Sequence, residues 1–81
     1  MKEYIENNYL KFAVYGETRA KIMCLKEYLK ETDYAIIKMY EEVVQGGSII
    51  EMLKEYKEVL AKRKEARRLI NELETGEENG N

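Results

Sequence analysis

Histidine, proline and tryptophan are absent from the 81-residue sequence, and Cys24 is its only cysteine. Without histidine or a second cysteine, the chain lacks the usual zinc ligands, the Cys–His nucleophile pair and the base of a serine triad. A disulfide within the chain is excluded for the same reason, and Cys24 is best interpreted as a small buried hydrophobic residue. We therefore predict no catalytic, metal-binding or cofactor-binding residues and no small-molecule substrate, in a protein that is not an enzyme.

Long hydrophobic runs are also missing. The longest apolar stretches have three or four residues, as at residues 12–15, whereas a membrane helix needs about 20. The first eight residues do not lead into the apolar stretch that a signal peptide requires. The net charge of -2 gives no general attraction to nucleic acid or anionic lipid. These absences predict a cytoplasmic protein without a membrane segment, or a component of an assembly built in the cytoplasm.

A helical pattern begins after Gly16 and extends to about residue 45. Its apolar positions follow one another at alternating intervals of three and four residues, which is the seam spacing of a long amphipathic helix. The seam comprises Ile22, Leu25, Leu29, Thr32, Ile36, Met39 and Val43. We predict a first long helix over residues 17–45, with Thr18 as its N-cap.

A glycine-rich turn separates this helix from a second one. The adjacent Gly46-Gly47 predicts a helix end in left-handed backbone conformation, and Ser48 is the predicted N-cap of the next helix. The apolar face that follows predicts a second long helix over residues 48–74. The polar tail at residues 76–81 has nothing to bury and is predicted to be disordered, so residues 1–75 form a single domain.

Two long helices predict an all-α fold built on an antiparallel helical hairpin. The N-terminal segment is predicted to be a short helix, because Ile5, Tyr9 and Phe12 share one helical face; an extended arm is the alternative. A two-helix hairpin of this size leaves apolar residues uncovered, so the N-terminal segment packs as a third helix, the hairpins assemble into a bundle, or both. The predicted oligomer or partner face consists of Ile37, Tyr40, Val44, Met52 and Val59.

Arg63 interrupts the apolar face of the second long helix, where an unpaired guanidinium would be costly. In an antiparallel hairpin that turns at the glycine pair, Thr32 and Asp33 lie within one helical turn of Arg63. The same register places Glu27 near Arg67. We therefore predict a cross-hairpin polar cluster that sets the register of the two helices. A pair of arginines that binds a ligand is the alternative.

Two motifs meet in this predicted cluster. The first helix reads YL-x-x-TDY-x-x-x-K from Tyr28 to Lys38, and the second reads R-x-x-x-R-x-x-IN-x-LE from Arg63 to Glu74. This combination resembles small helical-hairpin proteins of phages and prophages of Gram-positive bacteria, of the kind encoded in tail and host-attachment modules. The resemblance covers about residues 25–74 and implies no catalytic activity.

The resemblance, the seam and the surplus of apolar residues lead to one functional expectation. The chain is expected to be a non-enzymatic assembly or adaptor protein of a phage or prophage, oligomeric and virion- or tail-related, with itself or a phage structural protein as partner. It would reside in the host cytoplasm or be incorporated into the virion. The alternative is a phage-encoded regulator or inhibitor that binds a host protein or nucleic acid. Nucleic acid is the weaker choice, because glutamates interrupt the basic residues 62–68 and favour a solvated helix face.

Overall fold

The computed structural model describes the backbone of residues 1–79 and the side chains of residues 1–76. Every regular element in this part of the chain is helical, which confirms the all-α class. The α-helices are α1 (Lys2–Asn8), α2 (Glu17–Val44), α3 (Ile49–Glu55) and α4 (Lys57–Asn79), and two 3-10 helices, Tyr9–Lys11 and Ala13–Tyr15, join α1 to α2. None of the described helices has the length and hydropathy required to cross a bilayer.

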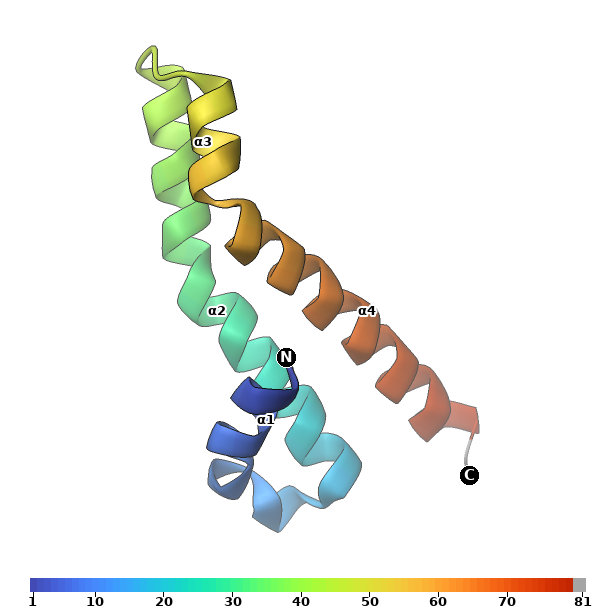
Figure 1. Cartoon of the computed structure of the whole chain (residues 1–81). Helices are drawn as coiled ribbons and strands as arrows, with labels where there is room; N and C mark the ends of the chain where they lie inside the picture. The colour runs from blue at the N-terminus through green and yellow to red at the C-terminus, as the bar shows by residue number, and fades with distance from the viewer. Residues whose placement is uncertain (80–81) are drawn as a thin grey trace.

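The central element is α2, and the other helices lie against it (Figure 1). α1 packs beside the N-terminal half of α2, while α3 and α4 return along α2 as a second arm, which we call the return arm. The molecule is elongated, with dimensions of 50 × 24 × 17 Å. Its shape follows from the 28 residues of α2, because an α-helix rises about 1.5 Å per residue.

The bounds of α2 match the predicted first helix within one residue at its C-terminal end, but its N-cap differs from the prediction. Gly16 is the N-cap, at a φ of 95°, and its carbonyl accepts a hydrogen bond from the Ala20 amide at 2.9 Å. Glycine suits this position because other residues are strained at positive φ. Thr18 lies inside the first turn, so the predicted Thr18 cap is wrong.

The return arm consists of two helices, where a single helix over residues 48–74 was predicted. Tyr56 alone separates α3 from α4, at φ -101° and ψ 8°. Backbone hydrogen bonds continue on both sides, from the Tyr56 amide to Met52 at 3.0 Å and from the Leu60 amide to Tyr56 at 2.9 Å. The break redirects the arm, and α4 diverges from α2 toward its C-terminal end (Figure 1). No proline or glycine lies next to Tyr56, so the sequence contains none of the residues that usually mark a helix break.

The turn between α2 and α3 uses its two glycines in different ways. Gly46 has a φ of 96° and takes the left-handed conformation. Gly47 does not, but a Cβ atom there would lie 2.7 Å from the Glu42 backbone oxygen, so the close approach of the chain favours glycine. Ser48 Oγ accepts a hydrogen bond from the Glu51 amide at 3.3 Å, which confirms the predicted N-cap.

The C-terminal helix extends further than expected. α4 passes through Gly76 and ends at Asn79, whereas the predicted helix ended at residue 74 and the predicted disordered tail began at residue 76. One glycine destabilises a helix by about 1 kcal/mol relative to alanine, which is too little to end the helix at that residue. Residues 80 and 81 of the predicted tail lie outside the described residues.

The N-terminal segment is helical rather than extended, although it is not one continuous helix. α1 ends at Asn8, whose side-chain amide donates a hydrogen bond to the Tyr4 carbonyl at 2.9 Å. Such side-chain bonds to the backbone compete with helix propagation, and the chain continues in two 3-10 turns. Ile5, Tyr9 and Phe12 are half-buried, in agreement with the face that they share in the sequence.

The buried core lies at the end of the molecule where α1 packs. Ile22 and Leu25 of α2 meet Ala66 and Ile70 of α4 there, and Ile5 of α1 packs against them. We call this part the covered end (residues 1–33 and 61–76). The opposite part, the turn end (residues 34–60), contains no fully buried apolar residue. The two ends are therefore built from the same helices but differ in whether a third segment covers them.

Candidate functional site

The polar cluster around Arg63 lies at the border between the two ends. The Arg63 side chain is only 11% exposed, and its Nη2 atom donates to Asp33 Oδ1 at 2.9 Å. Its Nη1 atom donates to the Leu29 carbonyl at 2.7 Å and to Thr32 Oγ1. The Thr32 hydroxyl in turn donates to the Tyr28 carbonyl at 2.8 Å. The structure thus brings Thr32, Asp33 and Arg63 together as the sequence predicted.

The geometry of this cluster suits a role in holding the two arms in register. Three acceptors from α2 surround one guanidinium from α4, so the buried charge is satisfied within the chain. Asp33 is 59% exposed and supplies a solvent-screened partner, whereas the Leu29 carbonyl and the Thr32 hydroxyl are part-buried. Arg67, the other arginine of the predicted pair, is exposed and makes no hydrogen bond or ion pair with residues 1–76, so only Arg63 belongs to this cluster.

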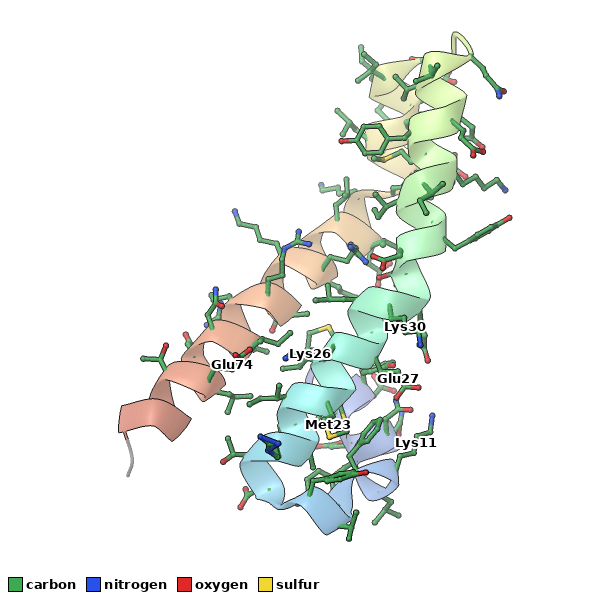
Figure 2. The ribbon with its side chains drawn as sticks, turned by 180° about the vertical axis from the view of Figure 1, so that it is seen from behind. Lys11, Met23, Lys26, Glu27, Lys30 and Glu74 are labelled. Carbon is green, nitrogen blue, oxygen red and sulfur yellow. The ribbon has the colours of Figure 1, made fainter. Side chains whose placement is uncertain are left out.

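Glu27 and Arg67 are not brought together, so that predicted pair is wrong. Glu27 faces the N-terminal segment, with its Oε1 atom 3.7 Å from Lys11 Nζ (Figure 2). The preceding residue, Lys26, reaches α4 instead, with its Nζ atom 3.8 Å from Oε1 of Glu74, which lies seven residues beyond Arg67 (Figure 2). Glu27 turns toward Lys11 rather than α4, because successive side chains on a helix differ by about 100° in direction around its axis.

Tyr4 fastens α1 to α2, a contact that the sequence did not predict. Its hydroxyl donates to Glu31 Oε2 at 3.0 Å, and its ring meets the Tyr28 ring edge to face, with centroids 5.1 Å apart. Burial, followed by the hydrogen bond and the negative charge of Glu31, raises the pKa of Tyr4 far above its usual range. The neutral phenol is therefore the form that the folded protein stabilises.

Apolar side chains gather at the turn end without a cover. Three residues of the predicted partner face are exposed there, with exposed fractions of 57% for Ile37, 65% for Tyr40 and 82% for Val44. The other two, Met52 and Val59, are half-buried and do not belong to the exposed set. Instead, α3 contributes three exposed residues that the prediction omitted, namely Ile49, Ile50 and Leu53. We call these six exposed residues the turn-end surface: Ile37, Tyr40, Val44, Ile49, Ile50 and Leu53.

Spacing could have identified the omitted residues. Ile50 and Leu53 are three positions apart on one helical face, and Lys57 and Leu60 continue that face into α4. Together with Lys54 they line a shallow groove of about 400 Å³ on the outside of the return arm. In α3, Met52 is half-buried, whereas Ile50 and Leu53 are exposed.

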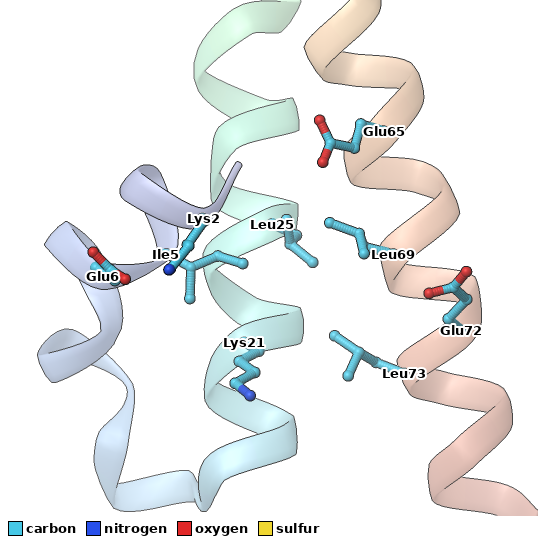
Figure 3. Close-up of a pocket in the computed structure, with 9 residues that line it drawn as sticks. All are labelled: Lys2, Ile5, Glu6, Lys21, Leu25, Glu65, Leu69, Glu72 and Leu73. Carbon is cyan, nitrogen blue, oxygen red and sulfur yellow. The ribbon is translucent and has the colours of Figure 1, made fainter.

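A second groove lies at the covered end, between α1, α2 and α4 (Figure 3). It has a volume of about 520 Å³ and an apolar floor with charged side chains at its rim. The floor is formed by Ile5, Leu25, Leu69 and Leu73, and the rim by Lys2, Glu6, Lys21, Glu65 and Glu72 (Figure 3). The rim carries both signs of charge, so the groove has no electrostatic preference for a ligand of one sign.

Reactive groups in the described chain are few. Cys24 is fully buried, and burial raises the pKa of its thiol, which disfavours the reactive thiolate. Among the described residues, no three histidine, cysteine, aspartate or glutamate side chains form a group that could hold a metal ion.

Comparisons with protein-family models, curated proteins and solved structures gave no match. The turn-end surface is consequently the feature of the molecule that most needs a functional explanation.

Proposed function

We propose that this chain is a non-enzymatic helical assembly or adaptor protein of a phage or prophage, which acts through protein contacts in a virion- or tail-related complex. The observation that carries the proposal is the turn-end surface, where six large apolar side chains are at least 51% exposed. Contiguous exposed apolar patches of several hundred Å² commonly mark interaction sites on soluble proteins. A protein partner that covers this surface would remove it from water.

The shape of the molecule supports an adaptor role. The core that holds the fold together lies at the covered end, and the cluster around Arg63 fixes α2 against α4 next to it. The turn end therefore projects from a stabilised base and contributes little buried apolar surface to the fold. Such a division favours a binding role for the turn end, because its surface residues are not required to form the core.

The phage part of the proposal rests on the resemblance in sequence. Its most specific residues are Thr32-Asp33-Tyr34 on α2 and the set Arg63, Arg67 and Ile70-Asn71 on α4. Three of these residues, Thr32, Asp33 and Arg63, form the cross-helix cluster, which gives the pattern a physical reason. Before incorporation into a particle, the protein would reside in the host cytoplasm.

Detection in purified virions tests this function. After induction of the strain that encodes the chain, the protein should co-purify with particles in a fixed ratio to the major capsid protein. Val44→Lys should reduce incorporation at least fivefold, whereas Leu10→Lys should not, because Leu10 is 88% exposed at the covered end. Absence from particles, with all of the protein in the soluble host fraction, would favour the alternative function of a phage-encoded regulator or inhibitor of a host protein.

A further inference from the structure

The buried residues of α2 face two different sides of that helix. Ile22 and Leu25 pack against α4 in the core. Ala20 and Cys24 are fully buried as well, but they do not belong to that cluster. Because each residue turns a helix by about 100°, Ala20 and Cys24 lie roughly opposite Ile22 and Leu25 around the axis. Something other than α4 therefore covers Ala20 and Cys24.

The cover is the N-terminal segment, residues 1–15, which we call the strap. α1 and α4 flank α2 from either side (Figure 3), and both 3-10 helices also contact α2. Ala20, Cys24, Glu27 and Glu31 follow one another at intervals of four, three and four residues, so they share one face of α2. Glu27 and Glu31 on this face are the residues that bond to the strap.

The thiol of Cys24 lies close to the strap. Burial, followed by the charge of Glu27, raises the pKa of this thiol, and the charge of Lys11 opposes the rise. Lys11 is a residue of the strap, and its Nζ atom lies 3.7 Å from Glu27 Oε1. Charges at a protein surface are screened over about 10 Å, so Lys11 acts on the thiol from nearby. A reagent can reach this thiol only when the covered end opens.

Few buried contacts hold the strap in place. None of its residues is buried, and its contacts with the core are those of Met1 and Ile5, which are half-buried. Three of its apolar side chains are more than half exposed, namely Leu10, Val14 and Tyr15. Its longest helix has seven residues, which is too short to be stable without tertiary contacts. Segments with few buried apolar contacts are those that open most readily.

The pairing of α2 with α4 does not depend on the strap. Arg63 bonds to three acceptors at residues 29–33 of α2 and to none in the strap. α2 also begins at its own N-cap, Gly16, whose carbonyl accepts a hydrogen bond from the Ala20 amide. Gly16 joins the strap to α2, and glycine tolerates the changes in φ and ψ that a hinge requires.

We propose that the strap is a detachable cover, which turns about Gly16 and leaves α2 as a unit while α2 and α4 keep their contacts. This inference goes beyond the proposed function and does not depend on it. The covered end then has a closed form and a less populated open form. The open form exposes the side of α2 that carries Ala20 and Cys24, which the closed form withholds from any partner.

Labelling of Cys24 with Ellman's reagent measures the open form in the full chain, because the chain contains no other thiol. Where the rate rises in proportion to the reagent, it reports the population of the open form. In native buffer, labelling should be at least about tenfold faster than the globally unfolded population allows. The logarithm of the rate should rise with urea less than about half as steeply as that of the global unfolding constant, since release of the strap exposes less surface.

Two variants separate release of the strap from global unfolding. Tyr4→Phe removes the bond to Glu31 that only the closed form makes, and it should speed labelling about fivefold. Thr32→Val is the matched control, because it removes a cross-helix contact that the open form retains. It should lower the urea midpoint of global unfolding but change the labelling rate by less than about twofold. Far-UV circular dichroism verifies that both variants keep the helical content of the wild type.

Three outcomes would overturn the inference. Labelling at the rate of global unfolding, with the full urea slope, would show that the strap does not leave by itself. Acceleration by Thr32→Val in proportion to its loss of global stability would show the same. An unchanged rate in Tyr4→Phe would show that the reagent reaches Cys24 through a movement other than release of the strap.

Discussion

The covered end and the turn end share the same helices but differ in what they bury. Among residues 1–76, the six buried apolar residues lie at positions 20–25 and 66–70, where α1 packs against the core formed by α2 and α4. The turn end continues the seam of α2 without interruption through Ile36, Met39 and Val43, yet those residues are only half-buried. The difference shows that seam spacing predicts which face of a helix turns inward, whereas burial depends on whether a third segment is present.

The two ends also differ in what they contribute, since one supplies stability and the other a surface for interaction. The covered end supplies the close-packed interior, whose loss should unfold the protein. The turn end supplies exposed apolar area, whose loss should affect association more than folding. Four experiments test this difference between the two ends.

Truncation of a leucine at each end should give the largest contrast. Leu25 is fully buried, so Leu25→Ala should lower the free energy of unfolding by about 2–5 kcal/mol through lost transfer energy and a cavity. Leu53 is 51% exposed, and Leu53→Ala should cost about 1 kcal/mol or less. Urea denaturation of a dilute sample, followed by circular dichroism at 222 nm, measures both values. Equal losses would mean that the turn end contributes to the core as much as the covered end does.

Disruption of the cluster between the two ends should have the next largest effect. Thr32→Val removes an acceptor from a guanidinium that is 11% exposed, and it should cost about 1–3 kcal/mol. Arg63→Met combined with Thr32→Val should recover part of that loss, because the buried guanidinium that lost one of its acceptors is then absent.

Asp33→Ala is the matched comparison within the same cluster. Its carboxylate is 59% exposed and Arg63 keeps two other acceptors, so the expected cost is about 1 kcal/mol or less. A double-mutant cycle with additive losses for Thr32 and Arg63 would contradict the account of this cluster.

Alkaline pH should weaken the covered end through Tyr4. The folded protein raises the pKa of this phenol above its unfolded value, so the stabilisation is present below about pH 10 and is lost as pH rises toward the folded pKa. Tyr4→Phe should cost about 1 kcal/mol near neutral pH through the lost bond to Glu31. The loss of stability of the wild type above pH 10 should be steeper than that of Tyr4→Phe. Parallel slopes for the two proteins would show that Tyr4 titrates as it does in the unfolded chain.

Replacement of Gly76 should have the smallest effect. Gly76 lies inside α4, its φ is not positive, and nothing stands within 4 Å of an added Cβ. Gly76→Ala should therefore increase helicity and stabilise the protein by up to about 1 kcal/mol. Gly46→Ala is the informative control. Because Gly46 has a φ of 96°, the same substitution there should lower the free energy of unfolding. A destabilised Gly76→Ala would argue that the helix ends before this residue.

Sequence periodicity predicted the helices well, since α2 spans Glu17–Val44 and Ser48 caps α3. It predicted the level of Arg63 relative to Thr32 and Asp33, because an antiparallel register depends only on the position of the turn and on the helical rise. It failed where rotation about the helix axis decides the outcome, as for Glu27, which turns toward Lys11.

The turn-end surface shows a second source of error. The three α2 residues of the predicted partner face are exposed, whereas Met52 and Val59, which were assigned to that face because they lie outside the two-helix seam, are half-buried. The break at Tyr56 occurs without a proline or glycine, and the helices on both of its sides, α3 and α4, pack against α2. A feature set by tertiary packing cannot be obtained from local periodicity.

The elongated shape has a practical consequence for measurements of mass. The radius of gyration is 15.3 Å, whereas a compact chain of this length has a value of about 12 Å. A rod diffuses more slowly than a sphere of the same mass, so a monomer of this protein will leave a gel-filtration column ahead of globular standards of 9.6 kDa. Its elution volume alone would imitate that of a dimer. Light scattering or sedimentation equilibrium, which do not assume a spherical particle, will distinguish a single long molecule from two.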